Sequence, residues 1–210
     1  MLLNEDKKIE NNTTESKIKD AAKIVFHKKG FAATRTRDIA EEAGLNLALL
    51  NYYFRSKKKL FEIIMMETLT GFMQNISLVF NDETLTLIQK IETIADRYID
   101  LLIEEPELPI FILSEMRNDP QAYANKMPIT KIILQSDFSK QYQQAFLDKK
   151  VNEANQIHFI MNLLSLIIFP VASSPMLKLV GNLNDNEFKQ LMLERKKKIP
   201  VWIAAMFFNH

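Results

Sequence analysis

Apolar residues near the start of the chain recur at intervals of three and four positions, which is the spacing of one face of a helix. The pattern predicts a helix that begins near Thr13 or Thr14 and ends at Gly30, a residue type that commonly terminates helices. Residues 1–12 are polar, and we expect them to be frayed. The apolar stripe consists of Ile18, Ala21, Ala22, Val25 and Phe26.

A small apolar face over residues 39–43 predicts a second, shorter helix. Thr34 or Thr36 can cap its start, and Asp38 suits the first turn, where a negative charge is favourable. Gly44 closes the face and suits the left-handed conformation that a tight turn between two helices requires.

A third short helix is predicted only a few residues after Gly44. Asn46 can cap its start, and we expect it to run to about Tyr53. Two short helices joined by such a turn have helix–turn–helix architecture. Ser56 can then cap a fourth helix.

The predicted helices lengthen after residue 56, and no alternating strand pattern of useful length interrupts them. We therefore expect an all-α chain, with a three-helix domain at residues 1–55 and a larger helical domain at residues 56–210. Pro128 should kink or split one helix, and a break is predicted from Pro170 to Gly181. The long helices are predicted near residues 56–80, 84–104, 107–117, 120–148, 152–169 and 184–208.

The composition restricts the chemistry that the chain can perform. The 210 residues include four Gly and no Cys, and the three histidines are far apart in sequence. A disulfide framework and a cysteine nucleophile are therefore excluded, and no metal-ligand spacing is present. The sequence also has no Gly-rich phosphate loop and no serine elbow motif. We expect a protein that is not an enzyme and that holds no metal or cofactor.

The net charge of +1 conceals an asymmetry along the chain. Residues 1–60 carry 13 Lys and Arg against 8 Asp and Glu, whereas residues 61–210 carry 14 against 18. Either the first part meets a polyanion, or solvated charges are distributed by chance. The N-terminus lacks an apolar core of signal-peptide length, and the sequence lacks an uninterrupted apolar run long enough to span a membrane. We expect a soluble, cytoplasmic protein without a membrane partner.

The third predicted helix has one face that suits DNA reading. Leu50 is placed to pack against the other two helices, which leaves Leu47, Ala48 and Asn51 pointing away from the core. Asn51 can bond to an adenine edge or a phosphate, and the two apolar residues can touch thymine methyl groups. Lys57, at the start of the next helix, offers its charge and its backbone N–H to a phosphate.

Between residues 30 and 61 the chain resembles the DNA-binding domain of TetR/AcrR-type transcriptional regulators, in the segment GFAATRTRDIAEEAGLNLALLNYYFRSKKKLF. The matching positions follow the family pattern in register and without a gap, which makes the resemblance specific. They are Gly30, Phe31, Thr34, Asp38, Ile39, Ala40, Ala43, Gly44, Tyr53, Phe54, Ser56, Lys57 and Leu60.

The resemblance implies roles for individual residues. Residues 35–37 open the second helix, where the family contacts phosphate and sometimes a base. The outer face of the third helix would lie in the major groove, Tyr53 and Lys57 would hold backbone phosphates, and Leu50 and Phe54 would belong to the core. The implied DNA-binding set is Arg35, Thr36, Arg37, Asn46, Leu47, Ala48, Asn51, Tyr52, Tyr53 and Lys57.

The reader helix departs from the family pattern, which often has Lys, then Gly or Pro, then Thr or Ser at positions 47–49. This chain has three apolar residues there. Direct hydrogen-bond readout is therefore reduced, and methyl contacts or DNA shape would carry more of the specificity. Tyr52 and Tyr53 can instead be packing residues, and residues 57–59 can be an ordinary solvated face.

The larger helical part has more apolar surface than one core requires. Residues 158–171 are apolar on nearly every face, and a second stripe surrounds Trp202. These helices are either central in the core or form the homodimer that the resemblance implies. A dimer would place two helix–turn–helix units on an inverted repeat. The predicted interface residues are Phe159, Leu163, Leu166, Ile167, Trp202 and Met206.

The resemblance also implies a small-molecule pocket in the larger part. Soft apolar side chains with a few polar neighbours suit an apolar or amphipathic effector. His158, on an otherwise apolar face, is of a kind more often found as a core histidine than as a ligand contact. The candidate residues are Met66, Phe72, Phe111, Glu115, Tyr142, Phe146, His158 and Asn162.

These patterns together predict a dimeric transcriptional regulator that binds double-stranded DNA. The resemblance makes a repressor that is released by its ligand the default mode. The alternative is a helical protein–protein adaptor without sequence-specific DNA binding, against which the in-register basic residues 28–59 argue. Strong salt dependence of DNA binding would separate the two, because neutralised phosphates release counterions.

Overall fold

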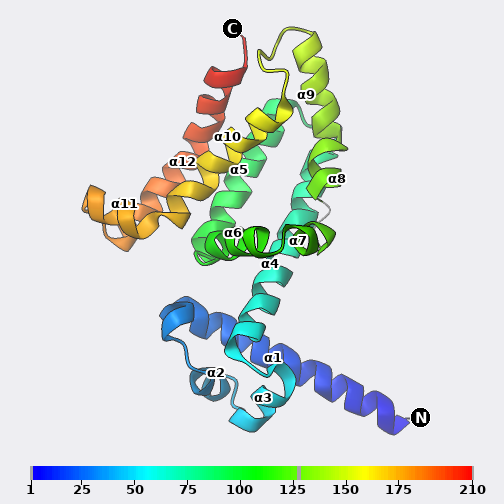
Figure 1. Cartoon of the computed structure of the whole chain (residues 1–210), viewed down its shortest axis with the longest axis vertical. Coiled ribbons are helices and arrows are strands. Elements are labelled where there is room, and N and C mark those ends of the chain that lie inside the picture. Colours follow the sequence, from blue (N-terminus) through cyan, green and yellow to red (C-terminus); the bar gives the residue numbers. More distant parts are fainter. Residues whose placement is uncertain (1, 127–128, 210) are drawn as a thin grey trace. The chain divides into compact units, whose positions relative to one another are not determined.

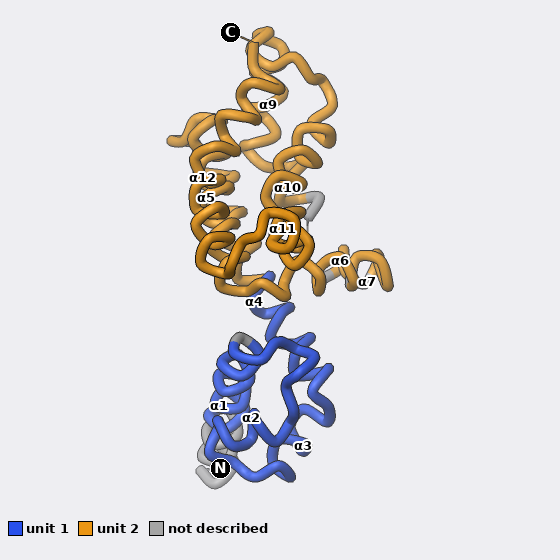
Figure 2. Tube along the Cα trace, turned by 90° about the vertical axis from the view of Figure 1, so that its left-hand side faces the viewer, with its two compact units in different colours: residues 1–69 blue, residues 70–210 orange. Residues whose placement is uncertain are grey.

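The computed structural model describes the backbone of residues 2–126 and 129–209 (Figure 1). Within these ranges the chain forms α-helices and no β-strand, which confirms the predicted all-α class. Two compact units, residues 1–69 and 70–210, meet inside the fourth helix (Figure 2). The helices are α1 (Leu2–Ala33), α2 (Thr36–Glu42), α3 (Leu47–Phe54), α4 (Lys57–Phe80), α5 (Leu87–Glu104), α6 (Leu108–Asn118), α7 (Pro120–Lys126), α8 (Ile129–Leu134), α9 (Asp137–Leu147), α10 (Gln156–Ala172), α11 (Ser174–Gly181) and α12 (Asp185–Phe207).

α1 begins earlier than predicted, at Leu2 rather than near Thr13. Residues 2–12 carry no apolar stripe, so the sequence pattern held no signal for this part of the helix. The backbone leaves helical geometry at Gly30, with φ 71° and ψ 165°, where the end was predicted. A short helical turn then continues to Ala33.

The core of unit 1 joins α1, α2 and α3 to the first turns of α4. The ring of Phe61 lies 4.7 Å from that of Phe31 and 5.2 Å from that of Phe26, measured between centroids. These contacts hold the start of α4 against the end of α1. The buried apolar residues of these helices include the predicted stripe of α1 together with Ile39, Ala40, Leu50, Phe54, Leu60 and Ile64.

α5 contacts α12, α10 and α9 in unit 2. Its first turn is fixed by a capping box, in which Thr86 and Gln89 each satisfy a backbone N–H of the other residue. Lys196 on α12 forms ion pairs with Asp96 at 3.0 Å and Asp100 at 2.6 Å on α5. The two helices are therefore joined by charge at the surface as well as by apolar packing.

The predicted break from Pro170 to Gly181 is confirmed at Ser173, where α10 ends and α11 begins at a bend of 72°, but the rest of the region is helical. Pro170 lies inside α10, and α11 fills most of the remaining segment. A proline within a helix removes the N–H that would bond to the carbonyl four residues earlier, here that of Leu166. Arg195 on α12 supplies the substitute, because its Nη2 donates to the Leu166 carbonyl at 2.8 Å. The kink predicted at Pro128 lies outside the described residues.

By length and composition alone, α4 is apolar enough to cross a membrane, and α10 with α11 would satisfy the same test as a pair bent by 72°. Helices in the core of soluble proteins can be equally long and apolar. α4 contributes Leu60, Ile64 and Leu69 to buried positions, which is the behaviour of a core helix.

Candidate nucleic-acid interface

The turn between α2 and α3 has the geometry that the sequence predicts. Gly44 has φ 65°, and the Leu45 N–H donates to the Ala40 carbonyl at 2.9 Å. A Cβ added at Gly44 would meet no atom within 4 Å, so backbone conformation rather than space requires the glycine. Asn46 caps α3, since its Oδ1 accepts the Leu49 N–H at 2.8 Å. The turn and cap fix where α3 begins.

The start of α2 differs from the prediction. Arg35 is the N-cap residue, and neither Thr34 nor Thr36 has that position. Thr34 is buried, and its Oγ1 donates to the Gly30 carbonyl at 2.7 Å. The threonine therefore closes the kink at the end of α1 instead of capping α2.

Asp38 holds the first turn of α2 as predicted. Its Oδ2 accepts the Arg35 backbone N–H at 2.9 Å and lies 3.1 Å from the Lys29 ammonium. The Arg35 hydrogen bond, and then the Lys29 interaction, hold the pKa of Asp38 below its usual value. The side chains of Arg35 and Arg37 stay exposed, while Thr36 is half-buried.

α3 presents one buried face and one exposed face. Leu50 and Phe54 are buried in unit 1, whereas Ala48, Asn51 and Tyr52 are exposed. Tyr52 is 77% exposed, so within this chain it is not a packing residue. Leu47 and Tyr53 are half-buried, and the Tyr53 ring lies edge-on to that of Tyr52 at 5.3 Å. The structure therefore gathers the predicted reading residues on one side of a single helix.

Lys57 makes contacts within the chain that the sequence did not predict. Its ammonium donates to the carbonyls of Phe31 at 2.7 Å and Thr34 at 2.8 Å, and it lies 4.4 Å from the centroid of the Phe31 ring. The charge that was assigned to a phosphate is therefore bound to the connection between α1 and α2. Sequence reasoning missed this contact because its partners are backbone atoms more than twenty positions away.

Arg55 is a strained residue that sequence reasoning also missed. It has φ 57° and ψ −36°, and the Ser56 N–H donates to the Phe54 carbonyl at 2.5 Å across it. This is a γ-turn with a positive central φ, a conformation that is rare for residues with a Cβ. The strain lies between the reader helix α3 and the start of α4.

Replacing Arg55 with glycine should raise the free energy of unfolding by about 1 kcal/mol, because glycine adopts positive φ without the Cβ penalty. Urea unfolding of Arg55→Gly against the parent measures the gain. Arg55→Ala is the control, since it removes the same charge but keeps the Cβ, and it should leave stability nearly unchanged. Equal stability of the two variants would show that backbone strain at this position is negligible.

Comparisons with known proteins agree with this geometry. Residues 18–64, which contain α2, α3 and the start of α4, match the profile described as "Bacterial regulatory proteins, tetR family". The DNA-binding region of the chain is thus similar to that of the tetR family. Over 200 residues it is 24% identical to "Probable HTH-type transcriptional regulator YttP" of Bacillus subtilis, covering 93% of this chain and 94% of that protein.

Two solved structures share the fold of this chain. HlyIIR, a hemolysin II transcriptional regulator, has a TM-score of 0.59 at 18% identity, covering 95% of this chain and 99% of the other. FadR of Bacillus subtilis, solved in complex with stearoyl-CoA, has a TM-score of 0.58 at 16% identity, covering 90% and 97%. The family and the YttP match identify a DNA-binding transcriptional regulator rather than an enzyme.

The candidate effector residues do not share one environment. Phe72, Phe111 and Tyr142 are buried, and Met66 is half-buried in unit 1. Three others are exposed, so they do not line an enclosed pocket within the described chain, and the side chain of Glu115 lies outside the description. The exposed three are Phe146, His158 and Asn162.

His158 is a surface residue rather than a core histidine. Its Nδ1 lies 3.1 Å from Glu153 Oε2, and its backbone carbonyl accepts from Asn162 Nδ2 at 2.8 Å. Glu153 also accepts the Tyr142 hydroxyl through its backbone carbonyl at 2.7 Å, and burial raises the pKa of Tyr142 to about 12. These contacts give the side chains structural roles at the start of α10.

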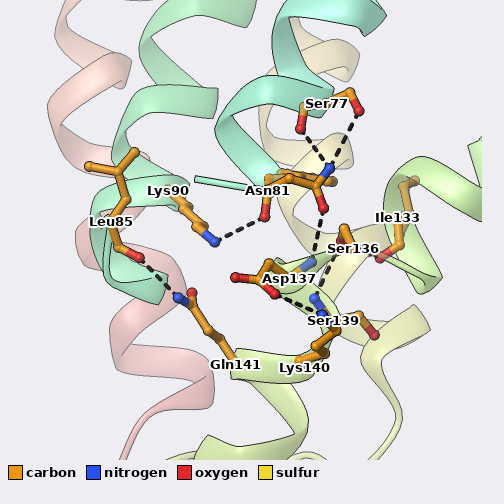
Figure 3. Close-up of polar contacts among 11 residues, drawn as sticks. Ser77, Asn81, Leu85, Lys90, Ile133, Ser136, Asp137, Ser139, Lys140 and Gln141 are labelled. Carbon is orange, nitrogen blue, oxygen red and sulfur yellow. Dashed lines mark hydrogen bonds and ion pairs between the residues drawn. The ribbon is translucent and has the colours of Figure 1, made fainter. Parts of the chain in front are cut away.

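Unit 2 contains buried polar groups that sequence reasoning missed. Lys90 is 0% exposed, and its ammonium donates to the carbonyl of Phe80, the last residue of α4, at 2.9 Å (Figure 3). Burial lowers the pKa of Lys90, and nearby carboxylates oppose the shift. Asn81 accepts the Asp137 N–H at 3.2 Å and donates to the Ser77 carbonyl at 2.8 Å. The end of α4 is thereby bonded to α5 and to the first turn of α9.

The predicted dimer residues divide into two groups. Phe159, Leu163 and Ile167 are buried in the core of their own chain, and Leu166 is half-buried. An interface on α10 would therefore have to use the exposed positions beside them rather than these three side chains. Trp202 and Met206 on α12 are exposed by 37% and 43%.

Proposed function

We propose that this TetR-family regulator is a dimeric repressor that binds an inverted-repeat operator through α2 and α3. The observation that carries the proposal is the exposed face of α3, where Ala48, Asn51 and Tyr52 stand beside half-buried Leu47. A helix in the major groove can present such residues to base edges and thymine methyl groups. Exposed Arg35 and Arg37 at the start of α2 would contact the phosphate backbone.

The dimer is proposed because one helix–turn–helix makes too few base contacts for useful specificity, whereas two copies read two half-sites one DNA turn apart. Exposed apolar side chains on α10 and α12 support a second copy as the partner. Such side chains are costly to leave in water when they cluster. They include Met161, Phe169, Val201, Trp202 and Met206.

We further propose that residues 1–55 read DNA and that residues 56–210 form the dimer and take up a small apolar or amphipathic effector. The apolar core of unit 2 and the stearoyl-CoA bound by the similarly folded FadR support this class of ligand. If the effector binds one spacing of the two reader helices better than another, it shifts operator affinity, and DNA shifts effector affinity by the same factor. In a bacterial cell the repressor would act in the cytoplasm.

Selection from a random duplex pool tests the operator. The purified protein should enrich an inverted repeat, and log K for the enriched site should fall linearly and steeply with log salt concentration. A helical adaptor would enrich no sequence at low salt. That outcome would contradict the repressor hypothesis and favour the adaptor hypothesis.

Arg37→Ala and Leu47→Ala should weaken binding in different ways. Loss of the Arg37 charge should reduce affinity for most sequences alike and lower the salt slope by about 1, because one phosphate contact is lost. Loss of the Leu47 side chain should relax preference at particular bases, with about 1–3 kcal/mol less discrimination per position. Titrations of both variants on the selected site and on single-base variants of it distinguish the two patterns.

Lys197→Ala is the matched control for these titrations, because it removes an exposed charge from α12 in unit 2. It should bind like the parent. Parent-like binding by Arg37→Ala and Leu47→Ala as well would mean that the reader helix is placed wrongly.

A further inference from the structure

The end of α1 and the start of α4 are joined through one side chain. The Lys57 ammonium donates to the carbonyls of Phe31 and Thr34 at 2.7 and 2.8 Å, and it lies 3.5 Å from the carbonyl of Ala32. The same ammonium stands over the Phe31 ring at 4.4 Å. An ammonium has three N–H donors, so these contacts account for its donor capacity.

The carbonyl groups that Lys57 binds are ones that need a donor. The last four carbonyls of a helix have no partner within the helix, and a cation near a helix C-terminus is favourable. Phe31 and Ala32 lie in the last turn of α1, immediately after the kink at Gly30. The Gly30 carbonyl is already satisfied by the Thr34 hydroxyl. Lys57 and Thr34 together therefore complete the end of α1.

A phosphate could take the Lys57 ammonium only by removing it from these carbonyls. Such a change would leave half-buried polar groups of the α1–α2 connection without a donor, at a cost that opposes the phosphate contact. Lys58 and Lys59, on the same turn, are instead exposed and reach Glu62 at 3.7 and 3.9 Å. Lys57 thus binds backbone carbonyls within the chain, whereas Lys58 and Lys59 keep their ammonium groups at the surface.

We propose that Lys57 is a positioning residue, which fixes the first turn of α4 against the α1–α2 connection and so holds α3 between them, and that its ammonium does not contact a DNA phosphate. The consequence for DNA binding rests on the proposed function. The hydrogen bonds from the Lys57 ammonium to the carbonyls of Phe31 and Thr34, called the clasp below, are present in the free protein. Lys57 thus fixes the geometry of the DNA-binding unit, and its charge does not bind DNA directly.

Lys57→Met, which keeps an unbranched apolar stem and removes the ammonium donors, tests the proposal against Lys58→Met as the matched control. Without DNA, Lys57→Met should lower Tm by several degrees and Lys58→Met should not. At a temperature where circular dichroism shows all three proteins folded, Lys57→Met should bind the selected operator about tenfold more weakly. Its slope of log K against log salt should equal that of the parent.

The salt slope separates positioning from phosphate contact. A slope reduced by about 0.9 in Lys57→Met would mean that a phosphate contact has been lost, and it would overturn the proposal. So would a parent-like Tm. If the parent itself selects no operator, the proposed function fails, while the Tm comparison still decides whether the clasp exists.

A measurement on the parent protein does not depend on a variant that folds. In ¹⁵N NMR of the free protein, the Lys57 ammonium protons should exchange with water slowly enough to give a resolved signal, whereas those of Lys58 should not. The signal should persist when operator DNA is added. Rapid exchange of the Lys57 protons in the free protein would overturn the proposal.

Discussion

Phe159→Ala should lower the free energy of unfolding by about 3–5 kcal/mol, the range found when a fully buried phenylalanine is truncated. Phe159 is 0% exposed, and its ring centroid lies 5.9 Å from Phe138, 5.1 Å from Tyr142 and 5.2 Å from Phe207. The truncation would therefore open a cavity between α9, α10 and α12. Urea unfolding at several protein concentrations measures the loss and separates it from dissociation of a dimer.

Met161→Ala is the control for Phe159→Ala, because Met161 lies on the same helix and is 59% exposed. It should cost little stability in the monomer but should weaken self-association if α10 contributes to a dimer. The opposite result would be that Phe159→Ala dissociates the dimer without destabilising the chain. It would support the interface role that the sequence predicts for Phe159.

Arg195→Met should cost about 1–3 kcal/mol of stability, which is the cost of leaving a half-buried carbonyl without its donor. The carbonyl of Leu166 has no helical partner because Pro170 lacks an N–H, and Arg195 Nη2 supplies the hydrogen bond at 2.8 Å. Arg195 also lies over the Trp202 ring at 5.0 Å, and that contact would be lost as well. Lys197→Met, an exposed change on the same helix, should be nearly neutral.

A double-mutant cycle isolates the part of this cost that belongs to the carbonyl. Pro170→Ala restores an N–H at the position that normally bonds to the carbonyl of Leu166. In that background Arg195→Met should cost less, with a coupling energy of about 1 kcal/mol or more. An equal cost in both backgrounds would show that Arg195 stabilises the protein through Trp202 or packing alone.

Local patterns with a strong physical signal could be read from the sequence. The positive φ of Gly44, the cap at Asn46 and the buried position of Leu50 each depend on residues close by in the chain, and each is confirmed. The predicted reading face could be anticipated for the same reason, because residues 47–54 form one helix with one buried side.

The sequence was least informative where a distant partner decides the outcome. Pro170 alone indicates a break, and only Arg195 on another helix explains why α10 continues through it. The hydrogen bonds of Lys57 could not be predicted, because its backbone acceptors leave no mark in the side-chain pattern. Phe159 was placed at an interface because a strongly apolar helix does not reveal whether its own chain or a second copy covers it.

The burial of Lys90 makes its amine a reporter of motion. A reagent in solution that acylates amines can reach the Lys90 nitrogen only when the bond to the Phe80 carbonyl breaks and α5 separates locally from the end of α4. The rate at which Lys90 becomes labelled, compared with that of exposed lysines, therefore counts the openings of this corner and measures their free energy. If the labelling rate of Lys90 changes when operator or effector is present, binding of that ligand alters the opening of the C-terminal end of α4.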